Sequence, residues 1–333
     1  PGAARLGTRR STMATTQSRL VADAITERTG VEVELELITS FGDTTRAHLT
    51  QLGGTGVFVS ALRDALLDGG VDFAVHSLKD LPTAPAEGLV LAAVTERDDP
   101  RDALCARDGL TLEALPAGAR VGTGSPRRAA QLAAHRPDLA YVPIRGNAET
   151  RLGKVASGEV DAVVLAYAGL VRVGRVDAVT DVLDPDRVLP APGQGALAVE
   201  CRADRAGADL AYLSAVDHTA TRLAVTAERT VLAELEAGCA APVGAYARLE
   251  GGVLRLEAAV ASTDGSRQVR AVRTAETDAD PASLKAAADP ASLKAAADLG
   301  RELARSMIAD GADRIVADPG EIGGGAAGPA AGA

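Results

Sequence analysis

The sequence contains no tryptophan, and aromatic residues make up only 2% of its 333 positions. Aromatic platforms for stacking bases are therefore scarce, and with a formal net charge of −10 this counts against nucleic acid as a partner. The core must be built from Ala, Val and Leu instead. No apolar run approaches the roughly 20 residues that cross a bilayer, so we expect no membrane partner. The first residues lack a charged head before an apolar stretch, so we also expect no signal peptide.

Cysteine and histidine are too few for a metal or disulfide framework. The three cysteines, Cys105, Cys201 and Cys239, are far apart and odd in number, which favours a reducing compartment, the cytoplasm. No pair of histidines has metal-ligand spacing, so we expect no metal site, and a metal-dependent hydrolase would lack its ligands. Cys105 and Cys201 lie in strand-like sequence and are expected in the core. Cys239 follows a glycine on a loop, where either a buried apolar thiol or a functional one would fit.

Short apolar strands alternate with helical segments over the first two thirds of the chain. This order predicts βαβ units and mostly parallel sheets, an α/β fold. A charged break at 96–102 and a Pro/Gly-rich break at 190–195 look like hinges between two lobes. A strand over 196–200 could return to the first lobe. Strands are expected at 31–37, 71–75, 89–94, 120–122, 141–144 and 160–166, and helices at 57–67 and 147–157.

The last third has a different pattern, with a helix over 217–236 and three strand-like runs at 243–249, 253–260 and 268–273. Gly251-Gly252 and Asp264-Gly265 are hairpin turn signals, so we predict a small α+β domain with a three-stranded antiparallel sheet. The expected domain limits are 1–96 with 196–215 for lobe 1, 101–190 for lobe 2 and 217–318 for the third domain. The Gly/Ala-rich tail at 319–333 is expected to be disordered.

Residues 281–289 recur without change as residues 290–298. A solenoid needs at least three repeats, and Pro290 would interrupt a helix that ran through both copies. We interpret the repeat as a tandem duplication without function at a surface loop before the final helix.

Polar residues follow a buried strand at His76-Ser77-Leu78-Lys79-Asp80. Ligands of α/β folds bind at the carboxyl ends of such strands. Lys79 and Asp80 would place an anion-binding ammonium and a carboxylate at one point. The same two residues could instead form a structural salt bridge at the strand end.

Arginines follow other strand ends in both lobes. Ser125 and Pro126 have the types expected at the N-cap and first position of a helix, which puts Arg127 and Arg128 in its first turn. Cations oppose the helix dipole there, which favours an anion site over a solvated face. The remaining strand-end arginines are Arg9 and Arg10, Arg145 with Arg151, and Arg172. Together they predict a cleft for a polyanionic ligand.

The sequence as a whole resembles the porphobilinogen deaminase (hydroxymethylbilane synthase) family from Arg5 to about Ala317. The motifs are specific in their order and spacing rather than one by one. They are TRRS at 8–11, VHSLKDLP at 75–82, RDDPRD at 97–102, GTGSPRR at 122–128, RGN at 145–147, LPAPGQGA at 189–196 and GC at 238–239. The resemblance implies two periplasmic-binding-protein-like lobes, a third domain that carries the cysteine, and a monomer.

The same resemblance implies a transferase that condenses four porphobilinogen molecules head to tail on a covalent dipyrromethane primer. It would release hydroxymethylbilane and ammonia in tetrapyrrole and heme biosynthesis. Each porphobilinogen brings two carboxylates, which suits an arginine-lined cleft. The primer would be joined through a thioether to Cys239, and Asp80 would be the catalytic carboxylate. Cofactor-side positions by this resemblance are Lys79, Thr123, Ser125, Arg127, Arg128, Arg145 and Arg151. Substrate-side positions are Arg9, Ser11, Gln17, Arg145, Arg151 and Arg172.

A different class of protein stays open from the residues alone. A non-catalytic two-lobed binding protein for a small polyanion would share the lobes and the arginines. It would have no use for a third domain with a thiol loop. The intact mass of the purified protein separates the two hypotheses, because a covalent dipyrromethane adds a discrete mass to the chain.

Overall fold

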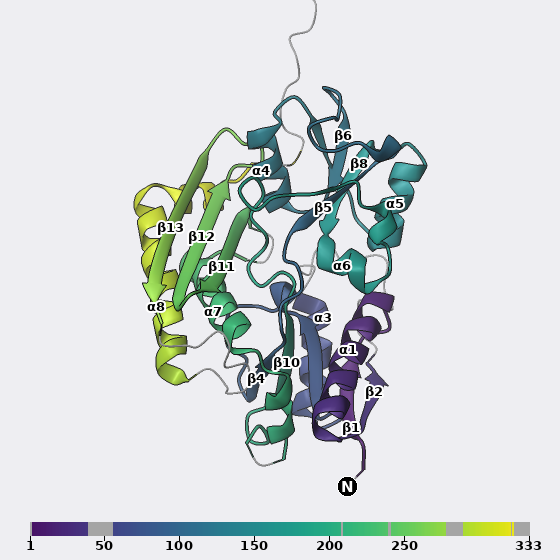
Figure 1. Cartoon of the computed structure of the whole chain (residues 1–333), viewed down its shortest axis with the longest axis vertical. Coiled ribbons are helices and arrows are strands. Elements are labelled where there is room, and N and C mark those ends of the chain that lie inside the picture. The colour runs from purple at the N-terminus through teal and green to yellow at the C-terminus, as the bar shows by residue number, and fades with distance from the viewer. Residues whose placement is uncertain are drawn as a thin grey trace, which may run out of the picture.

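The computed structural model describes residues 2–38, 56–207, 209–238, 241–277, 289–320 and 322, with the side chains of 56–58 left aside. These residues form three sheets, one in each of three bodies (Figure 1). Lobe 1 lies at the bottom of the view, lobe 2 above it, and the third domain beside both. The expected two α/β lobes and three-stranded antiparallel domain are confirmed.

Lobe 1 contains a five-stranded sheet in the order β2-β1-β3-β10-β4. Helix α1 (Thr12–Thr29) packs on one face and α3 (Gly56–Leu67) on the other, so that the sheet is covered on both sides. The short helix η1 (Leu78–Asp80) follows β3 directly. The strands are β1 (Ala4–Thr8), β2 (Val33–Leu37), β3 (Phe73–Ser77), β4 (Leu89–Val94) and β10 (Leu197–Arg202).

Lobe 2 repeats this architecture with the strand order β7-β6-β8-β5-β9. Helix α4 (Pro126–His135) covers one face, and α5 (Ala148–Ala156) and α6 (Tyr167–Arg172) cover the other. The strands are β5 (Asp102–Ala106), β6 (Arg120–Thr123), β7 (Ala140–Pro143), β8 (Ala162–Ala166) and β9 (Asp181–Val182).

The expectation of mostly parallel sheets is only half correct. In lobe 1, β1 pairs in parallel with β2 and β3, but β10 is antiparallel to both β3 and β4. In lobe 2, β5 is likewise antiparallel to β8 and β9. Both β5 and β10 follow a crossover between the lobes directly. A strand that arrives from the neighbouring lobe has no preceding helix to reverse its direction, so it enters its sheet antiparallel.

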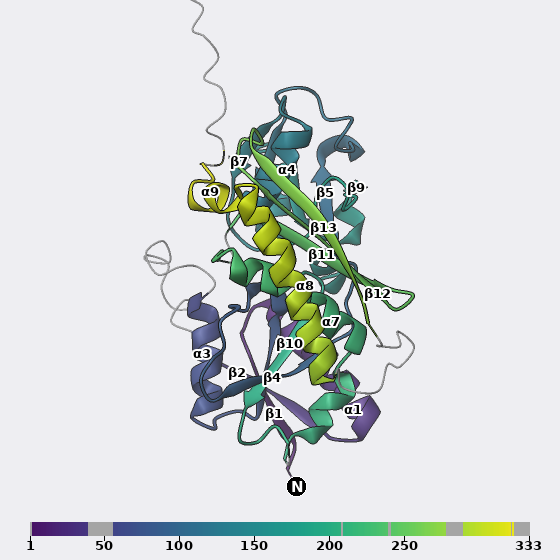
Figure 2. The ribbon, with the colours of Figure 1, turned by 90° about the vertical axis from the view of Figure 1, so that its left-hand side faces the viewer.

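The third domain is the sheet β11-β12-β13 covered on one face by two helices, α7 (Thr219–Glu234) and α8 (Pro290–Ala309). Figure 2 shows α8 running along this sheet, with the shorter α9 (Ala312–Ala317) after it. The strands are β11 (Val243–Glu250), β12 (Val253–Ala261) and β13 (Gln268–Glu276).

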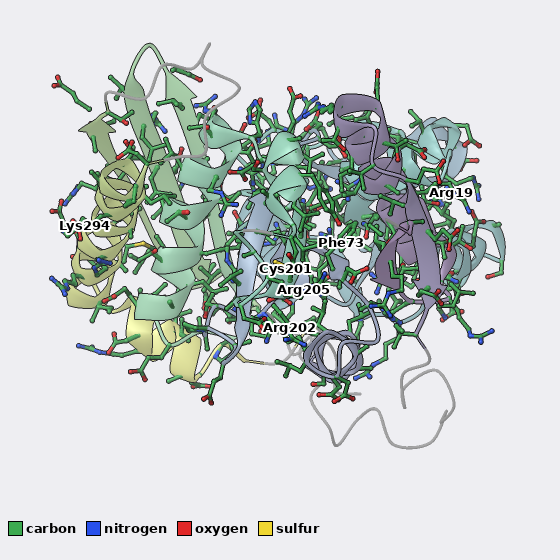
Figure 3. The ribbon with its side chains drawn as sticks, turned by 90° about the horizontal axis from the view of Figure 1, so that it is seen from below. Arg19, Phe73, Cys201, Arg202, Arg205 and Lys294 are labelled. Carbon is green, nitrogen blue, oxygen red and sulfur yellow. The ribbon has the colours of Figure 1, made fainter. Side chains whose placement is uncertain are left out.

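The core is aliphatic, as the composition requires. Of its few aromatic residues, Phe73 is fully buried and meets Tyr212 edge to face, with ring centroids 6.4 Å apart. Cys105 and Cys201 are free and buried, as expected. Figure 3 shows Cys201 beside Phe73 inside lobe 1, whereas Lys294 lies on the outer edge of the third domain.

One buried carboxylate, that of Glu228 on α7, fixes both crossovers to the third domain. Arg97 of the first crossover donates to it at 2.5 and 3.1 Å. The backbone N–H of Gly193, in the second crossover, donates at 2.7 Å, and that of Ala247, on β11, at 2.8 Å. Four donors on one enclosed carboxylate join the two hinge segments at a single point.

Some of the features expected from the sequence lie wholly or partly outside the residues that the structure describes. Cys239 and most of the first repeat copy, 281–288, lie outside them. Pro319, which we assigned to a disordered tail, is instead held in place, because its carbonyl accepts hydrogen bonds from the Thr263 backbone and hydroxyl at 2.7 and 2.9 Å. The tail residues 321 and 323–333 also lie outside.

The second repeat copy forms the first turns of α8. Asp289 caps this helix by accepting from the N–H groups of Ala291 and Ser292, and Pro290 takes its first position. Deleting residues 290–298 puts the identical first copy, preceded by Asp280, in the same sequence context. We therefore expect unchanged turnover and an unchanged thermal midpoint.

Differential scanning calorimetry and an assay of the shortened chain measure both quantities. A deletion of equal length over 299–307 is the control, because it removes Leu299, Leu303 and Met307 from the core and should prevent folding. A large fall in midpoint after deletion of 290–298 would show that the repeat is structural.

Candidate active site

A cavity in lobe 1 opens where three chain segments meet. These are the start of α1 with the residues before it, helix α3 with Val59 and Leu62, and the segment that runs from the end of β3 (Val75, His76 and Ser77) to Asp80 of η1. Four of the residues expected to bind substrate or act in catalysis line it together: Arg9, Ser11, Gln17 and Asp80. The prediction that strand ends gather the chemistry therefore holds for this lobe.

Local structure positions the polar groups of this cavity. Ser11 is the N-cap of α1, and its hydroxyl accepts from the Ala14 N–H at 3.3 Å. The amide of Gln17, one turn further along, donates to the Ser77 hydroxyl at 2.9 Å and so ties α1 to β3. The Asp80 carboxylate has no hydrogen bond or ion pair with any other residue that the structure describes, and it lines the cavity. The Asp80 carboxylate is therefore available to accept a hydrogen bond from a ligand or to face a positive charge on it.

Lys79 connects lobe 1 to the crossovers. Its ammonium donates to the side-chain carbonyl of Gln194 at 3.2 Å, and the amide of Gln194 donates to Asp102 at 2.9 Å and to the Pro100 carbonyl at 2.6 Å. Burial lowers the pKa of Lys79 to about 8, with a further contribution from the charges of Arg128 and Arg127, against the opposing effect of Asp80 and Asp102. The alternative of a plain Lys79–Asp80 salt bridge at the strand end is not what the structure contains.

Asp102, the first residue of β5, is fully buried and lies at the centre of this network. Arg127 donates to it at 2.7 Å, and Arg128 donates at 3.0 and 2.8 Å. The guanidiniums also bind carbonyls, Arg127 that of Leu189 and Arg128 that of Val164. Burial alone would raise the pKa of Asp102, but the charges and hydrogen bonds of the two arginines hold it far below its usual range.

Arg127 and Arg128 are therefore not on a solvated face, with exposures of 3% and 6%. The anion that the structure places at this helix start is Asp102, a side chain of the protein, and a ligand anion there stays a prediction. The turn before the helix is built as expected: Ser125 is the N-cap and accepts from the Arg128 N–H, and the fully buried Thr123 accepts from the Ser125 N–H at 3.2 Å.

The remaining arginines of lobe 2 differ in how they are held. Arg145 is exposed, after β7. Arg151 on α5 donates to the Gly146 carbonyl at 2.8 Å, and burial together with the charge of Arg128 lowers its pKa. Arg172 at the end of α6 pairs with Asp98 at 2.7 Å and donates to the Gly195 carbonyl at 2.6 Å. Arg172 therefore links lobe 2 to both crossovers.

The charges around Asp102 do not balance. The charges of Arg127 and Arg128 act on Lys79, and the charge of Arg128 also acts on Arg151, whereas the carboxylates that act on Lys79 are Asp80 and Asp102. Enclosed cations in excess over carboxylates repel one another and favour an added anion. The residues present thus fit a ligand that carries several carboxylates.

Sequence reasoning missed Asp102, Gln194, Glu200 and Glu228 as functional residues. Asp102 and Gln194 stood inside the motifs but were interpreted only as hinge sequence. A charged residue within the apolar strand at 196–200 was the available signal for Glu200. No group of three or more His, Cys, Asp or Glu side chains in the described ranges could hold a metal ion. No helix within those ranges is long and apolar enough to span a bilayer.

Comparisons with known proteins agree over nearly the whole chain. Residues 4–209 match the family model "Porphobilinogen deaminase, dipyromethane cofactor binding domain", and residues 222–309 match "Porphobilinogen deaminase, C-terminal domain". A porphobilinogen deaminase of Thermobifida fusca is 73% identical over 316 residues, which cover 95% of this chain and 96% of that protein. Porphobilinogen deaminase 1 of Streptomyces coelicolor is 58% identical over 325 residues, covering 95% and 98%.

Among solved structures, the chain is similar to a periplasmic substrate-binding protein of an ABC transporter from Coxiella burnetii. The TM-score is 0.41 at 16% identity, covering 64% of this chain and 91% of the other. A methionine-binding protein, MetQ, gives a TM-score of 0.41 at 13% identity, covering 64% and 89%.

The Asp102 network generates a prediction about stability. Asp102→Asn keeps the size of the side chain but removes the charge that compensates two enclosed guanidiniums. We expect the free energy of unfolding to fall by about 3–5 kcal/mol, the range for breaking a buried ion pair. Urea denaturation followed by circular dichroism measures it. Asp108→Asn is the matched control, because Asp108 pairs with Arg107 in solvent, and it should leave the midpoint unchanged. Equal midpoints for both variants would contradict the central place of Asp102.

Proposed function

This chain belongs to the porphobilinogen deaminase family, and we propose how its own residues divide the work of that family's reaction. It is a transferase that condenses four porphobilinogen molecules head to tail and releases hydroxymethylbilane and ammonia in tetrapyrrole synthesis. Its cofactor is dipyrromethane. We further propose that it acts as a monomer in the cytoplasm, with the domain limits expected from the sequence. The buried free thiols of Cys105 and Cys201 support a reducing compartment.

Cys239 is the proposed attachment point of the cofactor, through a thioether. The support comes from the other two thiols. Cys105 and Cys201 are enclosed in the cores of the lobes, and burial raises the pKa of both, that of Cys105 to about 11. A thiol that stays protonated is a poor nucleophile, so neither can compete for the linkage.

The cofactor would be held by the cationic cluster of the cleft. When bound, dipyrromethane supplies the free pyrrole carbon to which the first substrate is joined. Lys79, Arg145 and Arg151 keep donors for its carboxylates. Arg127 and Arg128 give hydrogen bonds to Asp102, so their main contribution to the cofactor is positive charge at fixed positions. Thr123 and Ser125 shape the turn that positions both arginines.

The substrate would lie in the cavity of lobe 1. Arg9, Ser11 and Gln17 line that cavity and can bind the acetate and propionate of porphobilinogen. Arg145, Arg151 and Arg172 face it from lobe 2 in this proposal. Arg172 already holds Asp98, so a substrate carboxylate would have to share that guanidinium.

Asp80 is the proposed catalytic carboxylate, and its place in the cavity wall is the observation that carries the proposal. When ammonia leaves the aminomethyl carbon, positive charge develops on the pyrrole ring. A carboxylate that the rest of the described protein leaves unpaired can face that ring and stabilise the charge. It can also hold the pyrrole N–H as a hydrogen-bond donor, which orients the ring for attack.

The attachment site is tested by the mass of the intact protein. Purified wild-type protein should exceed the mass of its chain by that of one dipyrromethane, and peptide mapping should place the addition on Cys239. Cys239→Ser should show the bare chain and no turnover. Cys201→Ser, which changes a buried thiol of the lobe 1 core, should keep the added mass. An addition on Cys105 or Cys201 would overturn the assignment.

The role of Asp80 is tested with Asp80→Asn, which keeps the shape and removes the charge. Turnover should fall by roughly 10²–10⁴, the range for a positioned acid or base. The added mass should remain, because Asp80 is not the attachment point. Asp108→Asn, which changes an exposed carboxylate paired with Arg107, is the control and should lose far less. Near wild-type turnover of a loaded Asp80→Asn variant would mean that another group stabilises the cation.

A further inference from the structure

The cavity wall contains one titratable group that the proposed mechanism does not use, His76. It stands on β3, is 7% exposed, and lines the same cavity as Asp80 and Arg9. Its Nε2 lies 3.2 Å from a carboxylate oxygen of Glu200, on the neighbouring strand β10. The contact is not aligned as a hydrogen bond, so this enclosed nitrogen has a carboxylate neighbour but no bonded partner among the described residues.

Glu200 is itself held by a third residue. Arg63 on α3 donates to its two carboxylate oxygens at 3.1 and 2.8 Å. Burial alone would raise the pKa of Glu200, but the interactions with His76 and Arg63 lower it to about 2. Glu200 is therefore ionised at any pH near neutrality. The arrangement is a fixed carboxylate behind a histidine at the wall of a substrate cavity.

The strand register explains why the pair forms. His76 is opposite Ala198 and Glu200 is opposite Ala74, so all four side chains share one face of the sheet. The small alanines leave space for the diagonal contact between His76 and Glu200. Helix α3 covers this face and brings Arg63 to the carboxylate. Three elements of lobe 1 thus converge on one imidazole.

We propose that His76 is the residue that takes up the proton released in each condensation, and that Glu200 is a positioning residue that holds its proton on Nε2. This proposal rests on the proposed placement of substrate beside Asp80. A carboxylate 3.2 Å from Nε2 needs only a small turn of the ring to accept its proton, which favours the tautomer protonated there and leaves the other nitrogen, Nδ1, as the acceptor.

The reaction requires such an acceptor. In each step the bond between the aminomethyl carbon and ammonia breaks, and ammonia leaves with the electron pair. A bond forms between that carbon and an α-carbon of the ring already bound, and this α-carbon then loses its proton. His76 accepts the proton through Nδ1 and passes it to the departing ammonia, which leaves as ammonium. Substrate enters as an ammonium and one ammonium leaves, so protons balance.

Asp80 is less suited to this proton transfer. The described cavity wall holds three ionisable side chains, Arg9, His76 and Asp80. Guanidinium stays protonated, and a carboxylate that accepted the proton would lose the charge needed to stabilise the next cation. Imidazole ordinarily titrates near neutrality, so it can accept and release a proton in every cycle.

The test compares His76→Asn with His135→Asn, a matched control. His135 also pairs with a glutamate, Glu113, at 2.9 Å, but it lies on the surface of lobe 2. We expect kcat of His76→Asn to fall by roughly 10² or more with KM changed little, and the control to keep wild-type values. Porphobilinogen deuterated at its free α-carbon should show a larger isotope effect on kcat with His76→Asn than with wild type. Intact mass confirms cofactor loading, which separates failure here from failure of the Cys239 assignment.

The pH dependence of kcat tests the role of Glu200, the partner of His76. Protonated His76 cannot accept, so wild-type kcat should fall toward acid pH. The charged groups around the imidazole are Glu200 on β10, Arg63 on α3, Asp80 on η1 and Arg9 before α1. Glu200→Gln removes the carboxylate beside Nε2, so the pH profile of kcat should differ from that of wild type. His76→Gln repeats the substitution with another shape in case His76→Asn does not fold.

Two outcomes would overturn the proposal. One is a loaded His76 variant with wild-type kcat and an unchanged pH profile. The other is a raised KM with unchanged kcat and isotope effect, which would make His76 a ligand of a substrate carboxylate instead.

Discussion

The arrangement of charges where the two lobes join depends on one enclosed carboxylate, Asp102. It begins the strand that enters lobe 2, it accepts hydrogen bonds from two arginines of α4, and through Gln194 it reaches Lys79 in lobe 1. An isolated carboxylate would not stay ionised at such a position, and two isolated guanidiniums would not stay enclosed. Their mutual compensation holds the cations at fixed, enclosed positions. Because one carboxylate cannot neutralise all of them, positive charge is left over, which is what the proposed binding of cofactor and substrate carboxylates requires.

The cavity of lobe 1 supplies what this cluster lacks. It places the carboxylate of Asp80 beside polar groups fixed by a helix cap and by the Gln17–Ser77 contact. In the proposed function, the cations bind the carboxylates at the rim of each pyrrole, and the Asp80 carboxylate faces the ring itself. Positively charged side chains can thus hold the carboxylates of a polyanion, while a negatively charged side chain stabilises the part of it that becomes positive in the reaction. Glu200 adds a second carboxylate on this side of the molecule. It is ionised, and it lies 3.2 Å from His76 in the cavity wall.

Local signals predicted much of this molecule. Ser125 and Pro126 begin α4 as expected, Asn147 caps α5, and Gly251-Gly252 turns the first hairpin of the third domain, because each feature depends on a few adjacent residues. The direction of β5 and β10 was not predictable in this way, since it depends on where the chain crosses between lobes. The partners of Arg127 and Glu200 were missed for the same reason: Asp102 lies 25 residues from Arg127, and Arg63 lies 137 residues from Glu200. The Arg residues at strand ends were found, but their division into enclosed and exposed groups follows from packing alone.

Glu228 fastens both crossovers through one side chain. Its carboxylate binds Arg97 of one crossover and the backbone of Gly193 in the other, so both connections between the lobes are fastened to α7 at the same place. A change at this one side chain would therefore release Arg97 and Gly193 together, so the two crossovers are not held independently of each other.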